Sequence, residues 1–201
     1  MTSLGYHRIT PLLRPGRNQR AGDNLNERDQ KGATPHHCAA RRNDKGWVCW
    51  LIEHGADVNA HDNPKPKPLH EAAGSRADEI TKMLLMATAS PSVVDAEGFS
   101  AFHYAALAAN IATVRKFIAW ILDVNQADGK GVTAPYHAAD DGWIAQGKIK
   151  ELVRAGANID ARNSDGQTAL NVAAHELVQC GASVNAMDMA GITPLIVLLD
   201  S

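Results

Sequence analysis

Residues 34–40 read Thr34-Pro35-His36-His37-Cys38-Ala39-Ala40, and this segment recurs along the chain. The further copies are Lys67-Pro68-Leu69-His70-Glu71-Ala72-Ala73, Ser100-Ala101-Phe102-His103-Tyr104-Ala105-Ala106, Thr133-Ala134-Pro135-Tyr136-His137-Ala138-Ala139, Thr168-Ala169-Leu170-Asn171-Val172-Ala173-Ala174 and the fragment Thr193-Pro194-Leu195-Ile196. Their second residues lie at positions 35, 68, 101, 134, 169 and 194, so the steps are 33, 33, 33, 35 and 25 residues. This period predicts a stack of small units that bury a core only against their neighbours, and it favours a binding surface over an active site.

Each copy carries signals for a short helix followed by a longer one. In the clearest unit, Thr34 suits the cap position of a helix and Pro35 its first residue, where no amide donor is needed. Asn43 tolerates the left-handed geometry of a break, and Gly55 can end the second helix. The apolar stripe expected on that helix consists of Trp47, Val48, Trp50, Leu51 and Ile52.

A second segment recurs after the longer helix. It reads Gly55-Ala56-Asp57-Val58-Asn59-Ala60 and returns as Asp123-Val124-Asn125, Gly156-Ala157-Asn158-Ile159-Asp160-Ala161 and Gly181-Ala182-Ser183-Val184-Asn185-Ala186. Together the two segments resemble the ankyrin repeat, whose signature is Gly-x-Thr-Pro-Leu-His-x-Ala-Ala and then Gly-Ala-Asp-Val-Asn-Ala. The resemblance implies an all-α fold, a helix-turn-helix repeat solenoid with β-hairpin-like loops and about five to six repeats, some degenerate. It also implies that the motif histidines (His37, His70 and His103) bond the residue at the Thr position that begins the motif, which is Thr34 in the first repeat, and neighbouring backbone.

The motif spacing divides the chain into units of unequal quality. Residues 1–25 are expected to be irregular or a partial N-terminal repeat, and residues 26–201 to form the ankyrin repeat domain. Its repeats are placed near 29–61, 62–94, 95–127 and 128–162, followed by a truncated unit at 163–187 and a partial C-terminal unit at 188–201.

Three irregularities carry expectations of their own. Lys65 stands at a hairpin-glycine position between Pro64 and Pro66, which predicts a distorted second hairpin. In the truncated unit Gly181 follows Ala174 by only 7 positions, whereas Gly55 follows Ala40 by 15, so one continuous or kinked helix is expected there. Residues 195–199 are apolar without a polar cap, which indicates either a fragment or association through this C-terminal end.

Composition and charge restrict the class of protein. Residues 1–50 carry nine Lys/Arg and four Asp/Glu, whereas residues 151–201 carry two and six, within a net charge of −2. This asymmetry is either uneven surface decoration or a basic end that prefers an acidic partner. Three cysteines without Cys-x-x-Cys spacing indicate free thiols in a reducing compartment, and no apolar run reaches the ~18 residues that span a bilayer. We therefore expect a cytoplasmic or otherwise intracellular protein without membrane insertion.

The clusters that resemble catalytic or metal sites fail on spacing. His36-His37-Cys38 are adjacent on a helix, where side chains point about 100° apart and cannot share one ion. His70-Glu71 and His175-Glu176 begin like a zinc-protease helix, but positions 74 and 179 are Gly and Gln. The N-terminal arginines have no interleaved aromatic residues, as a nucleic-acid platform would need. We expect no enzyme activity, cofactor, metal or nucleic-acid partner.

The resemblance also points to a binding surface, because hairpin tips and short-helix ends line a concave face in ankyrin-like stacks. Carried over residue by residue, it predicts the partner-binding residues Gln30, Lys31, Arg41, Arg42, Asn63, Glu97, Phe99, Leu107, Lys130, Asp140, Asp141 and Asp165, with Gly74 and Ser75 in the same row. Phe99 is the most specific of these, because a large aromatic residue at an exposed variable position suits an interface anchor. The alternative for Phe99 is packing onto a neighbouring hairpin.

The predicted function is a non-catalytic protein–protein interaction module that binds a protein partner across the concave face of hairpins and short helices. Two alternatives remain open at this point. One is a regulatory or targeting ankyrin segment of a larger protein, which the apolar residues 195–199 favour. The other is a degenerate structural array without a dedicated partner, which the truncated fifth unit favours.

Overall fold

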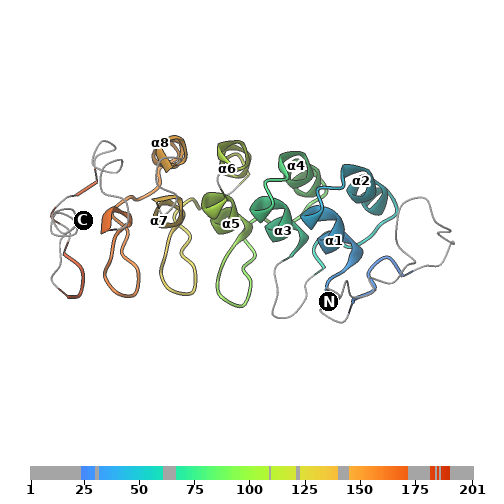
Figure 1. Cartoon of the computed structure of the whole chain (residues 1–201), viewed down its shortest axis with the longest axis horizontal. Helices are drawn as coiled ribbons and strands as arrows, with labels where there is room; N and C mark the ends of the chain where they lie inside the picture. Colours follow the sequence, from blue (N-terminus) through green and yellow to red (C-terminus); the bar gives the residue numbers. More distant parts are fainter. Residues whose placement is uncertain are drawn as a thin grey trace, which may run out of the picture.

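The structure is a computed structural model, and it describes residues 24–29, 32–60, 67–108, 110–120, 123–139, 145–171, 182–183, 185 and 187–190. Its α-helices form four short–long pairs, followed by a 3₁₀-helix (Figure 1). The elements are α1 (Pro35–Arg41), α2 (Lys45–Glu53), α3 (Pro68–Gly74), α4 (Asp78–Met86), α5 (Ala101–Leu107), α6 (Ile111–Ile118), α7 (Ala134–Ala139), α8 (Ala145–Arg154) and the 3₁₀-helix at Ala169–Asn171. The predicted all-α helix-turn-helix solenoid is confirmed over these ranges.

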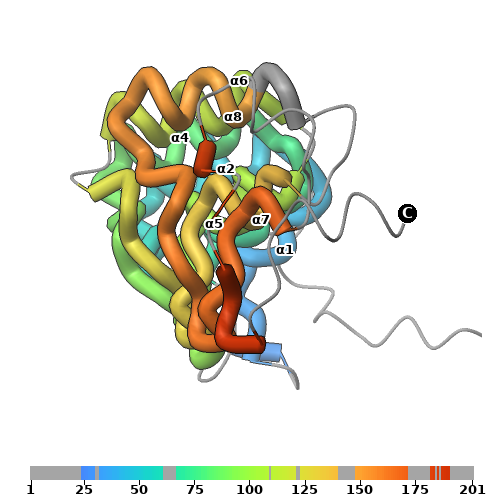
Figure 2. Tube along the Cα trace, turned by 90° about the vertical axis from the view of Figure 1, so that its left-hand side faces the viewer, coloured from blue at the N-terminus to red at the C-terminus, as the bar shows by residue number. Residues whose placement is uncertain are grey.

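The helices form two parallel rows. The odd-numbered helices α1, α3, α5 and α7 pack side by side, and so do the even-numbered helices α2, α4, α6 and α8. Each short helix also packs on the long helix that follows it. Figure 2 looks along the stack and shows the connecting loops projecting together away from the even-numbered row. The short helices and these loops therefore share one side of the molecule, which we call the short-helix face.

The local signals in the motif build the helix ends as expected. The Nδ1 atom of His37 accepts a hydrogen bond from the Thr34 amide (3.1 Å) and lies 2.9 Å from the Thr34 hydroxyl oxygen. His70 and His103 accept in the same way from the amides of Lys67 and Ser100, which confirms the role that the resemblance implied.

Small residues allow the two rows to approach each other closely. The paired alanines of the motif are buried in all four helix pairs, and they are Ala39, Ala40, Ala72, Ala73, Ala105, Ala106, Ala138 and Ala139. Large apolar side chains fill the remaining space, among them Trp47 and Phe117. Trp50, expected on the same apolar stripe, lies at the margin of this core, where it is partly buried and packs against the core while its ring stacks on His54 at 4.0 Å. The position lies toward the edge of the buried stripe, where the indole still contacts solvent.

The hairpin-like loops are joined to each other by their backbones. Single antiparallel bridges close two loops at Val94–Ser100 and Ala127–Thr133. At the tips, the amide of Gly129 donates to the carbonyl of Glu97 (3.0 Å), and the amide of Ser164 donates to that of Lys130 (2.9 Å). Neighbouring tips are thus held at a fixed spacing, which gives the short-helix face a rigid edge.

At one loop position a β-branched residue has a left-handed backbone conformation. Thr88 has φ 66°, whereas the equivalent positions in other repeats hold Gly55 (φ 76°) and Gly156 (φ 88°). A β-branched residue is strained in this region because its Cβ approaches the following carbonyl group. We expect Thr88→Gly to raise the free energy of unfolding by about 1 kcal/mol, measured by urea denaturation. A loss of stability would contradict this reading of the loop.

Several sequence predictions lie outside the described residues. They concern the irregular N-terminal segment up to residue 23, the second hairpin around Lys65, the helix expected between Ala174 and Gly181, and the apolar residues 195–199. These stay predictions.

Candidate functional site

The predicted partner-binding residues divide into those that the structure describes and those that it does not. Outside the described residues lie Gln30, Lys31, Asn63, Asp140 and Asp141. The described ones are Arg41, Arg42, Glu97, Phe99, Leu107, Lys130 and Asp165.

The two arginines lie at the C-terminal end of α1, and both are exposed. Arg41 reaches across to α3, where its guanidinium lies 3.7 Å from the carboxylate of Glu71. The Arg41 side chain is 51% exposed and that of Glu71 is 23% exposed. An ion pair of this kind is weak at the surface, so Arg41 remains able to exchange partners.

Three predicted residues occupy one register at the hairpin tips. Glu97, Lys130 and Asp165 each precede a hairpin glycine in successive repeats, and all three are exposed. Their backbones belong to the tip-to-tip contacts, since Glu97 and Lys130 accept the hydrogen bonds given above and Asp165 accepts one from Met189 (3.2 Å). Charges of alternating sign therefore line the rigid edge of the short-helix face.

Phe99 is not the exposed aromatic residue that the sequence suggested. It is half-buried, and its ring lies 5.8 Å from that of His103, 5.7 Å from that of Tyr104 and 4.9 Å from that of His137. The next repeat supplies His137 from α7, so Phe99 packs between two units, onto a neighbouring short helix where the alternative had placed a neighbouring hairpin. Leu107, by contrast, is 38% exposed at the end of α5.

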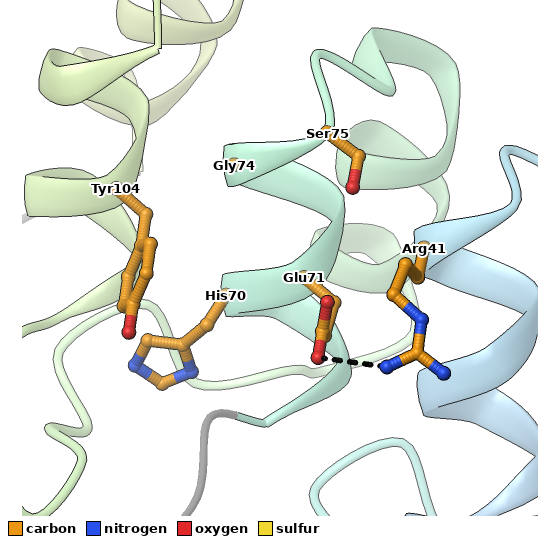
Figure 3. Close-up of a pocket in the computed structure, with 6 residues that line it drawn as sticks. All are labelled: Arg41, His70, Glu71, Gly74, Ser75 and Tyr104. Atoms are coloured by element: carbon orange, nitrogen blue, oxygen red, sulfur yellow. Dashed lines mark ion pairs between the residues drawn. The ribbon is translucent and has the colours of Figure 1, made fainter. Parts of the chain in front are cut away.

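A pocket of 370 Å³ lies between the short helices of three successive repeats. Its lining residues are Arg41 from α1, His70, Glu71 and Gly74 from α3, Ser75 just after α3, and Tyr104 from α5. Figure 3 shows Tyr104 and Arg41 on opposite sides, with His70 and Glu71 between them. The structure thus brings the predicted residues Arg41, Gly74 and Ser75 together in one hollow.

Burial shifts the pKa values of the groups in this pocket. It raises the pKa of the Glu71 carboxyl, an effect that Arg41 partly offsets. Burial is also the largest cause that raises the pKa of Tyr104, followed by the hydrogen bond from its hydroxyl to Asp95 (2.9 Å). The Tyr104 hydroxyl is therefore protonated at neutral pH, where it acts as a hydrogen-bond donor.

The imidazole of His70 is committed to holding the backbone. Burial lowers its pKa, so the ring is neutral near pH 7. Its Nδ1 accepts from the Lys67 amide (2.9 Å), which assigns the proton to Nε2. From there it donates toward the carbonyls of Val93 and Phe99, both at 3.1 Å. Neither nitrogen of His70 is therefore available as a general base.

The described residues also show no metal cluster or membrane span. Across these ranges, no group of three or more His, Cys, Asp or Glu side chains could hold a metal ion. In the same part of the chain, no helix has both the length and the apolar character to cross a bilayer.

Sequence reasoning missed three residues of the pocket, namely His70, which was expected only in a structural role, Glu71 and Tyr104. Glu71 and Tyr104 both occupy the variable position between the motif histidine and the paired alanines, and they lie 33 residues apart. Since short helices of neighbouring repeats pack side by side, side chains at this position come together on one face. The 33-residue period of the motif therefore already indicated that these two side chains lie close together.

Comparison with known proteins agrees with this architecture. The family described as ankyrin repeats (3 copies) matches residues 5–95. The chain is 30% identical over 153 residues to the nuclear factor NF-kappa-B p105 subunit of Gallus gallus, covering 75% of this chain and 16% of that protein. It is 35% identical over 142 residues to the mitochondrial disaggregase of Bos taurus, covering 67% of this chain and 20% of that protein.

A third relative is neurogenic locus notch homolog protein 1 of Xenopus laevis, 32% identical over 151 residues, which cover 74% of this chain and 6% of that protein. The chain thus spans a fifth or less of the length of these relatives. The repeated motif, the two rows of paired helices and these similarities together show that the chain belongs to the ankyrin repeat family.

Proposed function

We propose that this chain is a non-catalytic module that binds one protein partner across its concave face, formed by the hairpin tips and short helices. Ankyrin repeats are in general protein–protein interaction modules. The observation that carries the proposal here is the pocket on the short-helix face, which α1, α3 and α5 line jointly. A pre-formed hollow on a rigid stack binds without a large ordering cost.

The charges along this face would orient the partner. Arg41 and Arg42 lie at one end, exposed Leu107 follows, and the charged tips Glu97, Lys130 and Asp165 run beside them. A partner of complementary polarity would dock in one direction, because the reversed pose places like charges together. Of the predicted set, Phe99 supports this face from within, by packing between repeats.

The absence of catalysis belongs to the same proposal. In the pocket, His70 uses both ring nitrogens for backbone groups and Tyr104 keeps its proton, so the groups present favour recognition over reaction. We further propose an intracellular protein partner in preference to a nucleic acid, since the face mixes charges of both signs.

A second proposal concerns the context of the module. The relatives named above are much longer proteins, of which the chain covers between 6% and 20%. This favours a role as a regulatory or targeting segment within a larger protein, in which the repeat array supplies the binding surface for another activity. The test below applies to both forms, because both need the short-helix face.

The proposal is tested by selecting binding peptides from a displayed library on the immobilised full chain and measuring their affinities for surface variants. We expect Arg42→Glu and Leu107→Glu each to weaken the selected peptides at least tenfold, or about 1.4 kcal/mol. The matched controls Lys82→Glu and Met86→Glu change exposed residues of α4, in the other row, and should leave affinity unchanged.

Thermal unfolding of each variant shows that the fold is retained. Equal losses for the two pairs of variants, or no loss for either, would remove the short-helix face as the binding surface. A selection that returns no peptide above background would count in favour of the array without a dedicated partner.

A further inference from the structure

The pocket between α1, α3 and α5 owes its existence to one small residue. Gly74 stands 33 residues after Arg41 and 33 before Leu107, both of which carry long side chains. A Cβ atom built on Gly74 would meet only Tyr104 Cδ1, at 3.5 Å, which is an ordinary contact. The backbone at Gly74 is helical, so it does not itself require glycine. The missing side chain leaves a hollow bordered by the Tyr104 ring and the Glu71 carboxylate.

Glu71 lies in this hollow with unused hydrogen-bonding capacity. Its side chain is 23% exposed, and its one ion pair, with Arg41, spans 3.7 Å. Within the described ranges, no hydrogen bond is formed to this carboxylate, although an ionised carboxylate can accept several. Burial of a charge is favourable only when partners compensate for the lost water. A cationic group that entered the pocket would supply those partners.

The surroundings add to the negative potential. The carboxylates of Asp95, Glu97 and Glu71 all lie close enough to raise the pKa of the Tyr104 hydroxyl. The opposing cations are Arg41, half-exposed on the rim, and Lys67, which acts on His70. Among these described groups, three are carboxylates and two are cations, and the ring of Tyr104 provides an aromatic wall on which a cation can stack.

We propose that this pocket receives an arginine side chain of the protein partner, with its guanidinium between the Glu71 carboxylate and the Tyr104 ring. The proposal rests on the proposed function, because it assumes that a protein binds the short-helix face. Arginine fits better than lysine, since a planar guanidinium stacks on an aromatic ring while its forked donors bind a carboxylate. Arg41 is exposed enough to turn toward solvent when the ligand enters.

The test is a titration of the full ¹⁵N-labelled chain with N-acetylarginine methylamide, followed by amide chemical shifts. We expect saturable shifts at Glu71, Gly74, Ser75 and Tyr104. The citrulline analogue has nearly the same shape without the charge, and we expect it to bind at least tenfold more weakly. The lysine and glutamate analogues complete the series and should both bind more weakly than arginine.

Two variants test whether the arginine probe binds in the pocket or only to the negative charge of the surface in general. Glu71→Gln should weaken the arginine probe at least tenfold, whereas Glu79→Gln, the same change on an exposed residue of α4, should leave its affinity unchanged. Gly74→Leu should abolish binding by filling the hollow, and leucine suits a helix better than glycine. If Gly74→Leu fails to fold, the Glu71→Gln comparison decides alone.

The proposal is overturned if arginine gives no saturable shift, if citrulline binds equally well, or if the lysine or glutamate analogue binds more tightly. Its failure is distinguishable from that of the proposed function. If the arginine probe fails while Arg42→Glu and Leu107→Glu still weaken the selected peptides, the proposed binding face is supported and the arginine pocket is excluded. If the probe binds while those variants have no effect, the arginine pocket is supported and the protein-binding face is excluded.

Discussion

Acidification from about pH 6.5 to about pH 4 is expected to destabilise the folded chain strongly, and His36 is the main cause. Burial lowers the pKa of His36 from 6.5 to about 4, against a smaller opposing effect of the Asp57 backbone and carboxylate. The side chain is 1% exposed, and in the described part of the chain neither ring nitrogen has a hydrogen-bond partner. The Asp57 backbone is thus near enough to favour the protonated ring, but it does not complete a hydrogen bond.

The direction of the pH dependence follows from proton binding. Between pH 6.5 and about 4 the unfolded chain protonates His36 whereas the folded chain does not, so acid favours unfolding. The free energy lost over this window is about 3 kcal/mol for His36 alone. His70 and His103 act in the same direction, because burial lowers the pKa of each. The loss of about 3 kcal/mol from His36 is itself a large fraction of the free energy of unfolding of a typical small domain.

The variant His36→Leu isolates this effect. Leucine stands at the equivalent position as Leu69 and Leu170, both 1% exposed, so the site accepts its shape. We expect His36→Leu to raise the free energy of unfolding by about 1–2 kcal/mol at pH 7, because it removes two buried unpaired nitrogens, and by more than that at pH 5. Urea denaturation at both pH values measures this. A pH dependence that His36→Leu leaves unchanged would exclude His36 as the cause.

The second large effect is expected where two hairpins touch. Gly98 has φ 83°, and a Cβ atom there would lie 2.2 Å from the amide nitrogen of Gly129 and 2.7 Å from its Cα. Backbone atoms cannot move aside as a flexible side chain can, so the hairpins must separate. That movement also breaks the hydrogen bond from the Gly129 amide to the Glu97 carbonyl. We expect Gly98→Ala to lower the free energy of unfolding by on the order of 3 kcal/mol.

A matched glycine distinguishes the contact from the backbone conformation. Gly55 has φ 76°, but a Cβ atom there would meet nothing within 4 Å. Gly55→Ala should therefore cost only the left-handed strain, about 1 kcal/mol. Urea denaturation of the two variants gives the difference directly. Similar losses would mean that the hairpin tips move apart at little cost, and that the edge of the short-helix face is not rigid.

The helix pattern was predictable because its causes are local. The cap at Thr34, the left-handed break at Asn43 and the glycine at 55 are properties of a few consecutive residues, and the structure has each where the motif indicates. The burial of the paired alanines also followed, because a repeating period places equivalent residues at equivalent depths. Trp50 packs at the margin of the core and not inside it, because the residues at the edge of an apolar stripe keep contact with solvent, and periodicity does not say which residues lie at that edge.

The candidate site was only partly predictable, for a different reason. The variable positions of the motif pointed to Arg41, Gly74 and Ser75, which do line the pocket. The same reasoning took Phe99 for an exposed residue, although His103, Tyr104 and His137 surround its ring. Exposure at a variable position depends on the sizes of side chains from the next repeat. A single repeat read in isolation contains no information about them.

The order of elements follows from the 33-residue period, because each element depends on signals within one unit. The fold class and the side of the stack that carries the variable residues follow from the resemblance of the repeated motif to the ankyrin repeat. The tertiary structure alone decided that Gly74 leaves a hollow, that Glu71 lies in it without a hydrogen bond, and that Gly98 and Gly129 touch. Each of these depends on the distance between atoms of different repeats, and stacking sets that distance.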